Sequence, residues 1–510
     1  MHILSRNEPT AVQSSRRWLV GHAPIAELRA NTLADVPPVL AEAERLAASG
    51  RWLLGMVAFE AGGAFEPVAG AVRAAGELPL VWFRVFESVQ WHTQPPGSDA
   101  AAHLGRLTPT IDQPSYVAGF ERVRELIAAG DCYQVNLTFP LRGAFSGDPL
   151  ALARRLWRLS GPGYGALLAD ERWTVASGAP ELFFALDGER ITCRPMKGTR
   201  RRGRWPEEDD ALAEELGSAA KDRAENLMIL DMVRNDLGRV AETGTVRVPE
   251  RFTIERYPTV WQMTSTATAR TRAPLVELFA ALFPSASVTG APKRRTLQII
   301  GELEREPREA YCGAIGYLGP GRRAQFSVAI RTAVIDRARG TLRYDVGSGV
   351  VWDSTAESEW EECLVKAHAL SQSGERYELL ETLRWRPDEG YFLLDGHLDR
   401  LRRSAHHLGF AFDWDAAASA LSTAASDWRE PCIARLNLAA DGLLAVSQRA
   451  LGPRPTPLTA RLAAEPVDSA LPLLYHKTTA RGLYEQAQST VDTDEVILHN
   501  ERGEVTEFGI

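Results

Sequence analysis

Residues 283–304, FPSASVTGAPKRRTLQIIGELE, join a glycine-containing turn to a helix. The turn SVTGAPK (287–293) holds Gly290, and residues 291–304 have the apolar spacing of a helix. The turn matches neither G-x-G-x-x-G nor G-x-x-x-x-G-K-[ST], which disfavours a dinucleotide site and a phosphate-binding loop. Its backbone N–H groups can bind a carboxylate, although an ordinary turn is the alternative.

Outward from this stretch, segments rich in β-branched and aromatic residues predict strands. Upstream are YQVNLTFPL, YGALLAD, WTVASG, ELFFALDG and ERITCRP, and downstream are CGAIGYLG, AQFSVAIRTAVID and LRYDVGSGVVWD. Helices are expected over 116–130, around 211–237 and over 291–304. Many strands with few helices predict a large layered α+β domain and not a regular βαβ repeat.

A chain of 510 residues is too long for one compact core. A Pro/Gly/Ser-rich passage, QPPGSDAAAHLGRLTPT, and a polar stretch, SQSGERYE, suggest two boundaries. We therefore expect three parts, residues 1–105, 106–370 and 371–510, of which the second is the catalytic core.

Charge and composition exclude several classes of protein. The net charge of -8 disfavours nonspecific binding to nucleic acid or to a membrane surface. No apolar run approaches the roughly 20 residues that span a bilayer, and the first 20 residues lack a secretory signal. The five cysteines are scattered without a C-x-x-C pair, which excludes a disulfide framework and a zinc finger. We expect a cytoplasmic protein.

The first chemical motif is CRPMKGTRRRG, residues 193–203, which contains Lys197. A basic solvated loop is one interpretation, and a nucleic-acid patch is a second that the acidic net charge weakens. The neighbouring cations would lower the pKa of the lysine amine and leave it nucleophilic. Lys197 is therefore a candidate catalytic residue.

The second motif is a pair of acidic i,i+3 sites. Asp222 and Glu225 lie in KDRAENLMILDMVRND, and Glu359 and Glu362 lie in ESEWEECLVKA. Such pairs are usually solvated helix faces. If the two faces met, their oxygens would suit Mg²⁺, a hard cation that shares its coordination with an anionic ligand.

Two further turns, GAIGYLG (313–319) and VGSGVV (346–351), offer backbone N–H groups in the same way as the first. Arg331, in SVAIRT, could add a bidentate clamp on a carboxylate. Ordinary turns between strands remain the alternative for each turn taken alone.

Read in order, these segments resemble the chorismate-utilising enzymes, which include anthranilate, aminodeoxychorismate, isochorismate and salicylate synthases. The resemblance covers roughly residues 50–370. It rests on the following sequence motifs: GDCYQVNLT, GAPELFF, RPMKGTR, KDRAENLMILDMVRNDLGRV, FPSASVTGAPKRRTLQIIGELE, YCGAIGY, FSVAIRT and GSGVVWDSTAESEWEECLVKA.

The resemblance implies a function. Anthranilate synthases carry Ala where this chain has Lys197, and aminodeoxychorismate synthases carry Lys. The implied reaction is amination of chorismate to 4-amino-4-deoxychorismate, for p-aminobenzoate and folate synthesis, through a covalent intermediate on Lys197. Glu181 matches the general acid that assists departure of the C4 hydroxyl. Gln262 stands where many relatives have a His linked with pyruvate elimination, which favours amination without elimination.

The remaining implied roles are binding roles. The resemblance makes Glu225, Glu359 and Glu362 ligands of Mg²⁺, with Asp222 close by. It places the carboxylates of chorismate at Gly290, Tyr317, Arg331, Gly347 and Gly349.

No glutaminase motif is present, so the implied partner is a glutamine amidotransferase subunit that supplies ammonia. Two alternatives remain open: anthranilate synthase component I, and a noncatalytic paralogue that binds chorismate without turnover.

Residues 376–510 resemble the first part of a class IV pyridoxal phosphate (PLP) enzyme of the aminodeoxychorismate lyase type. Arg400 matches the arginine that binds the PLP phosphate, Lys477 the lysine that binds PLP covalently, and Glu507 the carboxylate that pairs with the pyridine nitrogen. The sequence ends three residues after Glu507, so we expect an incomplete, catalytically impaired segment. A bifunctional synthase-lyase is the alternative if the segment is completed.

Overall fold

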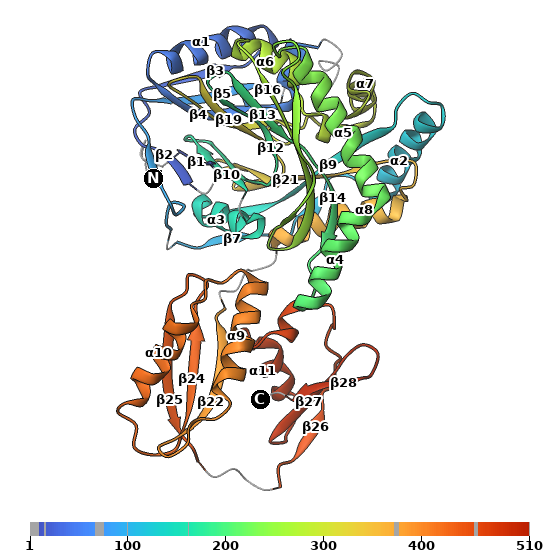
Figure 1. Ribbon diagram of the computed structural model, residues 1–510. Coiled ribbons are helices and arrows are strands. Elements are labelled where there is room, and N and C mark those ends of the chain that lie inside the picture. The colour runs from blue at the N-terminus through green and yellow to red at the C-terminus, as the bar shows by residue number, and fades with distance from the viewer. Residues whose placement is uncertain are drawn as a thin grey trace. The chain divides into compact units, whose positions relative to one another are not determined.

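The computed structural model describes residues 10–14, 17–66, 76–98, 100–161, 163–371, 377–452 and 457–508 (Figure 1). The chain forms two compact units: Met1–Arg200 with Glu215–Ser373, and Arg201–Glu214 with Gly374–Ile510. The expected boundary in SQSGERYE falls largely on residues 372–376, which lie outside the described residues. Residues 201–214, expected within the catalytic core, belong to the second unit.

One large sheet of the first unit holds eleven strands in the described part of the chain. Its order is β17 (Gly290–Ala291), β9 (Gln134–Gly147), β21 (Thr341–Val350), β20 (Thr332–Asp336), β11 (Trp173–Ala179), β10 (Tyr164–Ala169), β1 (Thr10–Ser14), β2 (Arg17–Gly21) and β6 (Gln90–His92). β7 (Ala102–Leu104) and β8 (Thr108–Pro109) also pair with β9.

The second large sheet holds ten strands among the described residues. Its order is β14 (Met196–Arg201), β16 (Val260–Arg270), β13 (Arg190–Arg194), β12 (Leu182–Asp187), β19 (Arg323–Val328), β18 (Ala314–Gly319), β4 (Trp52–Val57), β5 (Val81–Phe86) and β3 (Ala26–Ala30), and β15 (Arg247–Arg256) pairs with β16. Residues 1–105 thus share both sheets with the predicted catalytic core. Leu19 and Val175 of the first sheet pack with Trp82 and Ile315 of the second in one buried cluster.

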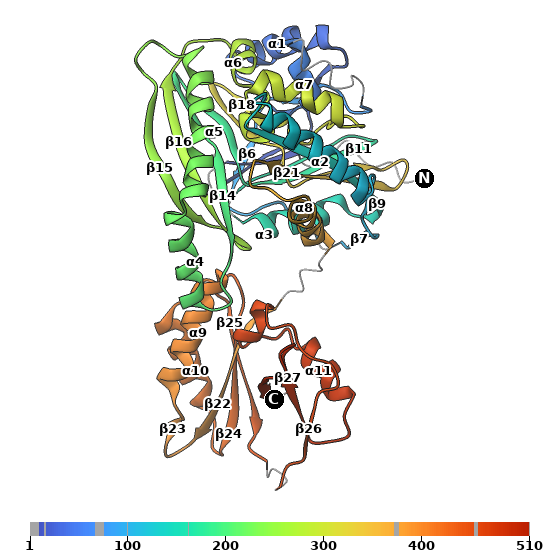
Figure 2. The same cartoon turned by 90° about the vertical axis from the view of Figure 1, so that its right-hand side faces the viewer.

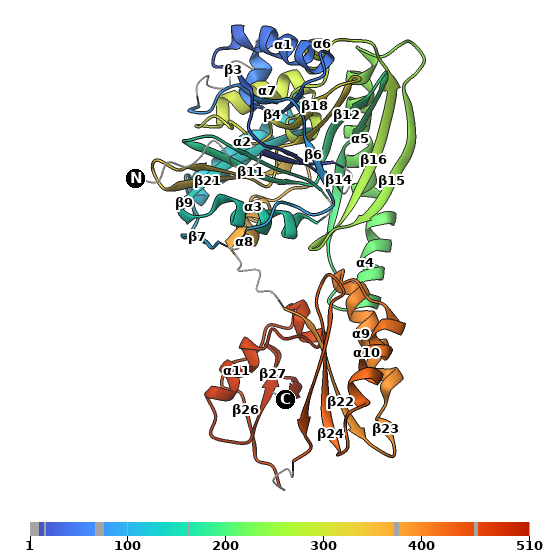
Figure 3. The same cartoon turned by 90° about the vertical axis from the view of Figure 1, so that its left-hand side faces the viewer.

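Helices cover these sheets. They are α1 (Val36–Ala48), α2 (Gln113–Ala128), α3 (Pro149–Ser160), α5 (Ala220–Gly238), α6 (Leu275–Leu282), α7 (Lys293–Leu303) and α8 (Ala356–Ser371). Figure 2 shows α2 and α8 side by side near β21, and Figure 3 shows α5 along β15 and β16 from the opposite side. Asp112 caps α2 by accepting the N–H of Ser115, and Asp148 caps α3 by accepting that of Leu150.

Two sequence expectations need correction. The single helix expected around 211–237 is two helices, α4 (Pro206–Ser218) and α5, because Ala219 is extended. The strand expected over AQFSVAIRTAVID is two strands, β19 and β20. Arg331 between them has a positive φ of 50°, which an extended strand cannot contain. The predicted α+β class is confirmed.

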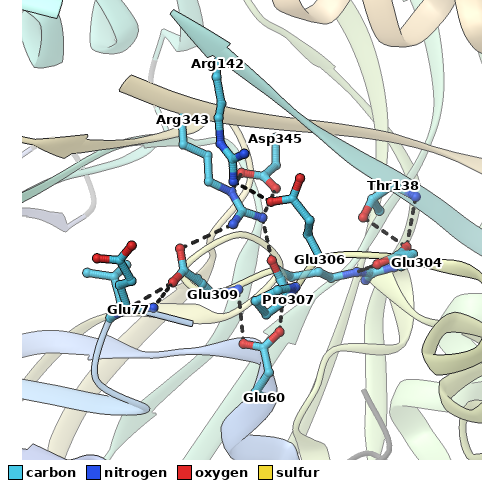
Figure 4. A network of polar contacts seen from close by, with 12 residues as sticks. Glu60, Glu77, Thr138, Arg142, Glu304, Glu306, Pro307, Glu309, Arg343 and Asp345 are labelled. Carbon is cyan, nitrogen blue, oxygen red and sulfur yellow. Dashed lines mark hydrogen bonds and ion pairs between the residues drawn. The ribbon is translucent and has the colours of Figure 1, made fainter. Parts of the chain in front are cut away.

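A buried polar network fixes the loop between α7 and β18 (Figure 4). Glu60 accepts the backbone N–H groups of Arg308 and Glu309 at 2.6 and 3.1 Å. Arg308 pairs at 2.6 Å with Glu304, which also accepts the N–H of Thr138 in β9. Because buried charges are costly unless paired, this network holds the loop in one conformation.

The second unit contains two small sheets. One has the order β23 (Gly390–Tyr391), β22 (Leu379–Arg386), β24 (Cys432–Leu438) and β25 (Leu444–Ala450), and the other β26 (Ala460–Leu462), β27 (Glu495–His499) and β28 (Val505–Phe508). Its other helices are α9 (Leu394–Leu408), α10 (Trp414–Ala425) and α11 (Gly482–Ser489). Arg202 pairs with Asp209 at 2.5 Å and donates to the carbonyl of His407, which ties residues 201–214 to this unit. None of the described helices has the length and apolar character needed to cross a membrane.

Candidate active site

Lys197 lies on β14, at the edge of the second sheet, and α5 fixes its backbone. The side-chain amide of Asn226 donates to the carbonyls of Lys197 and Met263 at 3.1 and 3.2 Å. Ser265 donates to the amide oxygen of Asn226 at 2.5 Å. Gly198, the next residue of the same strand, has a φ of +95°, a conformation that glycine adopts without strain. The lysine therefore stands on a rigid strand held by a helix.

The amine of Lys197 reaches the first sheet at β21. A Cβ atom added to Gly349 would lie 3.0 Å from Lys197 Nζ and 2.3 Å from Gln134 Nε2. The lysine can approach this closely only because residue 349 has no side chain. Gly349 in β21 and Lys197 in β14 are thus brought together from different sheets.

Glu181 lies between β11 and β12 and is 3% exposed. Burial raises the pKa of its carboxyl to about 7, against the opposing effects of a hydrogen bond from Ser287, the charge of Lys197 and the N–H of Met196. Burial also lowers the pKa of the Lys197 amine, although the nearby carboxylates of Glu225 and Glu181 oppose that shift. Burial favours the neutral form of both groups, which is a protonated acid beside an uncharged amine.

The two acidic helix faces approach each other. Burial raises the pKa of Glu225 on α5, and the charges of Asp222 and Glu359 add to that shift. Glu362 on α8 forms an ion pair with Lys366 at 2.6 Å. In the described part of the chain, no three acidic, histidine or cysteine side chains are gathered as a metal cage. Mg²⁺ commonly takes one or two carboxylates and shares the rest of its shell with substrate and water, and Glu225 and Glu359 fit that arrangement.

Two other predicted glycines allow close backbone packing. Gly290 has a φ of +143°, and a Cβ atom there would lie 2.1 Å from the carbonyl oxygen of Gln134. A Cβ atom at Gly347 would lie 2.6 Å from Thr138 Cγ2. Both glycines are thus required where β17 and β21 flank β9.

Arg331 has the strained backbone noted above, and burial lowers the pKa of its guanidinium. No carboxylate lies within ion-pair distance of Arg331 in the described ranges, although its charge is partly desolvated. An anionic ligand would compensate this charge.

Two further predicted residues, Tyr317 and Gln262, have contacts that the structure describes. The ring of Tyr317 lies 6.1 Å from that of Trp52 and 6.5 Å from that of Trp91, and Tyr317 belongs to the buried cluster that contains Trp82 and Ile315. Val346 and Val350, which flank Gly347 and Gly349, belong to a different buried cluster, so a contact of Tyr317 with substrate stays a prediction. Gln262 accepts a hydrogen bond from Thr199, two residues after Lys197 in β14, at 3.0 Å.

Sequence reasoning missed three residues at this site: Gln134, Asn226 and Lys366. Lys366 donates to the carbonyl of Gly347 at 2.9 Å, and its charge lowers the pKa of Lys197. The i,i+4 spacing of Glu362 and Lys366 was a readable signal. The position of Gln134 depends on the pairing of β9 with β21, which no local pattern indicates.

In the second unit, Arg400 binds the buried carboxylate of Glu381 with two hydrogen bonds of 2.7 and 2.6 Å. Burial lowers the pKa of the Lys477 amine, and the charge of Glu381 opposes this shift. Arg400 and Lys477 thus both interact electrostatically with the carboxylate of Glu381. Glu507 instead accepts a hydrogen bond from Tyr484 at 2.8 Å.

Comparison with known proteins identifies both parts of the chain. Residues 7–372 match the family model described as chorismate binding enzyme, and residues 378–510 match that of amino-transferase class IV. Aminodeoxychorismate synthase component 1 of Escherichia coli (strain K12) is 41% identical over 268 residues, which are 52% of this chain and 59% of that protein. Anthranilate synthase component 1 of Methanothermobacter thermautotrophicus is 40% identical over 262 residues, which are 51% of this chain and 56% of that protein.

The chain thus spans a little over half the length of these curated relatives. The crystal structure of anthranilate synthase component I from Streptococcus pneumoniae TIGR4 superposes with a TM-score of 0.62 at 23% identity, over 73% of this chain and 93% of that one. At this identity the likeness concerns the fold. By its match over residues 7–372, the chain belongs to the chorismate binding enzyme family, and residues 378–510 add an amino-transferase class IV segment.

Proposed function

We propose that the first unit aminates chorismate to 4-amino-4-deoxychorismate, as an aminodeoxychorismate synthase component I. The observation that carries the proposal is the position of the Lys197 amine against Gly349 and close to Glu181 and Glu225, where burial lowers the pKa of the amine. The lowered pKa favours the neutral amine, which is the nucleophilic form, and the raised pKa of Glu181 favours the protonated carboxyl, which is an acid, so the pair suits a displacement.

In the first step, Lys197 Nζ forms a bond to C2 of the chorismate ring, the ring double bonds shift, and the C4–O bond breaks. Glu181 gives its proton to the departing oxygen, which leaves as water. This splits one poor displacement into two easier ones. The pKa of about 7 suits an acid that works near neutrality.

In the second step, ammonia forms a bond to C4, the double bonds shift back, and the bond between C2 and Lys197 Nζ breaks. Lys197 leaves as a neutral amine. The new ammonium at C4 loses a proton to the Glu181 carboxylate, which restores the acid. Water is the only by-product, and the enol-pyruvyl group stays on the ring.

Binding of the substrate requires countercharges for its two carboxylates. Arg331 would bind one of them, because its guanidinium has no acidic partner among the described residues. Glu225 and Glu359, with Glu362, would hold Mg²⁺, which supplies positive charge to the other carboxylate. Backbone groups beside Gly290, Gly347 and Gly349 complete the predicted binding site.

The relatives called component 1 work, by that name, with a second component. We propose that a glutamine amidotransferase is the corresponding partner here and supplies the ammonia.

In the second unit, the charge of the site fits a phosphate-bearing cofactor. Burial and the charges of Arg400, Arg481 and Arg435 lower the pKa of Lys477, and only the charge of Glu381 opposes that shift among the causes of it. Arg400 would bind the phosphate, and Lys477 would hold pyridoxal phosphate, whose aldehyde condenses with amines. Glu507, which accepts a hydrogen bond from Tyr484, would pair with the pyridine nitrogen. The proposed function concerns the first unit alone.

The test is to incubate the protein with chorismate, Mg²⁺ and ammonium and to identify the products by mass-resolved chromatography. Aminodeoxychorismate without pyruvate is expected from the wild type, together with its loss in Lys197→Ala. Mass spectrometry of the denatured protein should also find a chorismate-derived adduct on Lys197 when ammonium is omitted. Anthranilate with pyruvate would overturn the proposal in favour of the sister reaction, and no turnover would favour the binding-only paralogue.

A further inference from the structure

The side chain of Asn226 joins α5 to two strands of the second sheet. Its amide nitrogen donates to the carbonyl of Lys197 in β14 at 3.1 Å and to that of Met263 in β16 at 3.2 Å. Its amide oxygen accepts from the hydroxyl of Ser265, also in β16, at 2.5 Å. Asn226 is 1% exposed and Ser265 is fully buried, so these bonds are shielded from competition by water.

The chemistry of its partners allows this amide only one orientation. A backbone carbonyl can only accept, so both N–H groups of Asn226 must face Lys197 and Met263. The amide oxygen must then receive its hydrogen from Ser265. The oxygen of Ser265 in turn accepts the backbone N–H of Phe252 in β15 at 3.1 Å. This chain of hydrogen bonds therefore runs in one direction, from Phe252 to the carbonyl of Lys197.

The first residue of the chain has an unfavourable backbone conformation. Phe252 has a positive φ of 56°, which a bulky residue keeps only where the surrounding structure holds it. The pairing of β15 with β16 shifts register at this point, between Glu250 and Thr253. The guanidinium of Arg223, on α5, lies 4.7 Å from the centre of the Phe252 ring. Because Arg223 and Asn226 are three residues apart, one face of α5 contacts both ends of the chain.

A second contact fixes β14 against the same helix. Arg200, near the end of β14, pairs with Asp222 of α5 at 2.9 Å. Glu225, a proposed ligand of Mg²⁺, lies between Asp222 and Asn226 in the sequence, and its charge acts on Lys197. The turn of α5 that presents Glu225 thus also holds the backbone of the nucleophile.

We propose that Asn226 is the positioning residue of Lys197: it fixes the backbone of β14 so that the amine reaches Gly349, and Ser265 sets the orientation of its amide. This inference rests on the proposed function, in which Lys197 attacks chorismate. Asn226 acts through Lys197 and not on the substrate. Its removal should therefore slow the step in which the Lys197 bond forms and leave substrate binding in place.

The experiment compares three variants with the wild type. Asn226→Leu has a similar volume and removes all three bonds of the side chain. Asn226→Asp keeps the shape but turns a carboxylate oxygen toward two carbonyls that can only accept. Ser265→Ala removes only the hydrogen bond that orients the amide. The control is Ser327→Ala, which also removes a buried serine hydroxyl, one that donates to the carbonyl of Ile315.

Two kinds of measurement separate positioning from a general structural role. The first is single-turnover formation of the Lys197 adduct without ammonium, followed by mass spectrometry of the denatured protein. The second is steady-state kcat with ammonium, together with KM for chorismate and the Mg²⁺ concentration that gives half the maximal rate. Melting curves establish that each variant is folded.

In Asn226→Leu the rate of adduct formation and kcat should both fall about 10- to 100-fold, because a reacting atom displaced by about 1 Å costs about a hundredfold. KM for chorismate and the Mg²⁺ requirement should change by less than about twofold, since the lost interaction serves the chemical step. Asn226→Asp should lose at least as much. Ser265→Ala should lose about three- to tenfold, and Ser327→Ala should keep the wild-type rate.

Adduct formation at the wild-type rate in a folded Asn226→Leu protein would overturn the proposal, as would an equal loss in Ser327→Ala. A fall in kcat with a matching rise in KM or in the Mg²⁺ requirement would overturn it in favour of a structural role. If neither variant of Asn226 folds, Ser265→Ala against Ser327→Ala decides the question. A wild type that forms no adduct on Lys197 would instead overturn the proposed function, so the two failures can be told apart.

Discussion

Replacing Gly349 with alanine tests whether Lys197 acts from the position that the fold gives it. The added Cβ would lie 3.0 Å from Lys197 Nζ and 2.3 Å from Gln134 Nε2. An ordinary contact between such atoms is about 3.5 Å. The amine must therefore move by about 0.5 Å and the amide of Gln134 by about 1 Å. Gln134 is 1% exposed, so it has little room to move away.

The expected loss follows from the geometry of attack. Reacting atoms in a near-attack arrangement are about 3–3.5 Å apart, and a misplacement of 1 Å can cost about a hundredfold in rate. A displacement of half that size should lower kcat by roughly tenfold or more. Overpacking should also cost about 1–3 kcal/mol of stability, which leaves a folded protein.

The assay is single-turnover formation of the Lys197 adduct, followed by mass spectrometry of the denatured protein. Gly238→Ala is the matched control, since an added Cβ at Gly238 meets nothing within 4 Å at the end of α5. Adduct formation at the wild-type rate in a folded Gly349→Ala protein would refute the placement of the amine against β21.

Three further outcomes are expected. Arg331→Met should raise KM for chorismate about 10- to 100-fold, because it removes a charged hydrogen bond to the substrate, and steady-state kinetics with unchanged KM would exclude this role. Glu60→Gln should remove a pH dependence of stability. Burial raises the pKa of Glu60 to about 7 from its ordinary 4.5, so its stabilising contribution is complete below about 4.5 and is lost as the pH rises through 7, by on the order of 3 kcal/mol in total. Urea unfolding at pH 5 and pH 8 should therefore show a smaller decline in Glu60→Gln than in the wild type. Lys477→Ala should abolish any absorption change that added pyridoxal phosphate produces, whereas an unchanged titration would show that the cofactor binds elsewhere or not at all.

The sequence predicted the residues of the candidate site better than their arrangement. Lys197, Glu181 and the acidic pairs were recognisable because each lies in a long sequence motif that resembles a motif of the family. Gln134 and Asn226 were not recognised as site residues, since a single side-chain amide has no local signal. Their importance comes from partners that are far away in the sequence, Gly349 for Gln134 and Lys197 for Asn226.

The sequence by itself determined the α+β class and most of the strand-forming segments, because these depend on local propensity and on the pattern of apolar residues. The tertiary structure alone decided that β14 and β21, from different sheets, bring Lys197 to Gly349. It also decided that residues 201–214 belong to the second unit. The physical reason is that long-range strand pairing and burial set the surroundings of a side chain. Those surroundings fix the pKa of a buried amine or carboxyl, which its neighbours in the sequence do not.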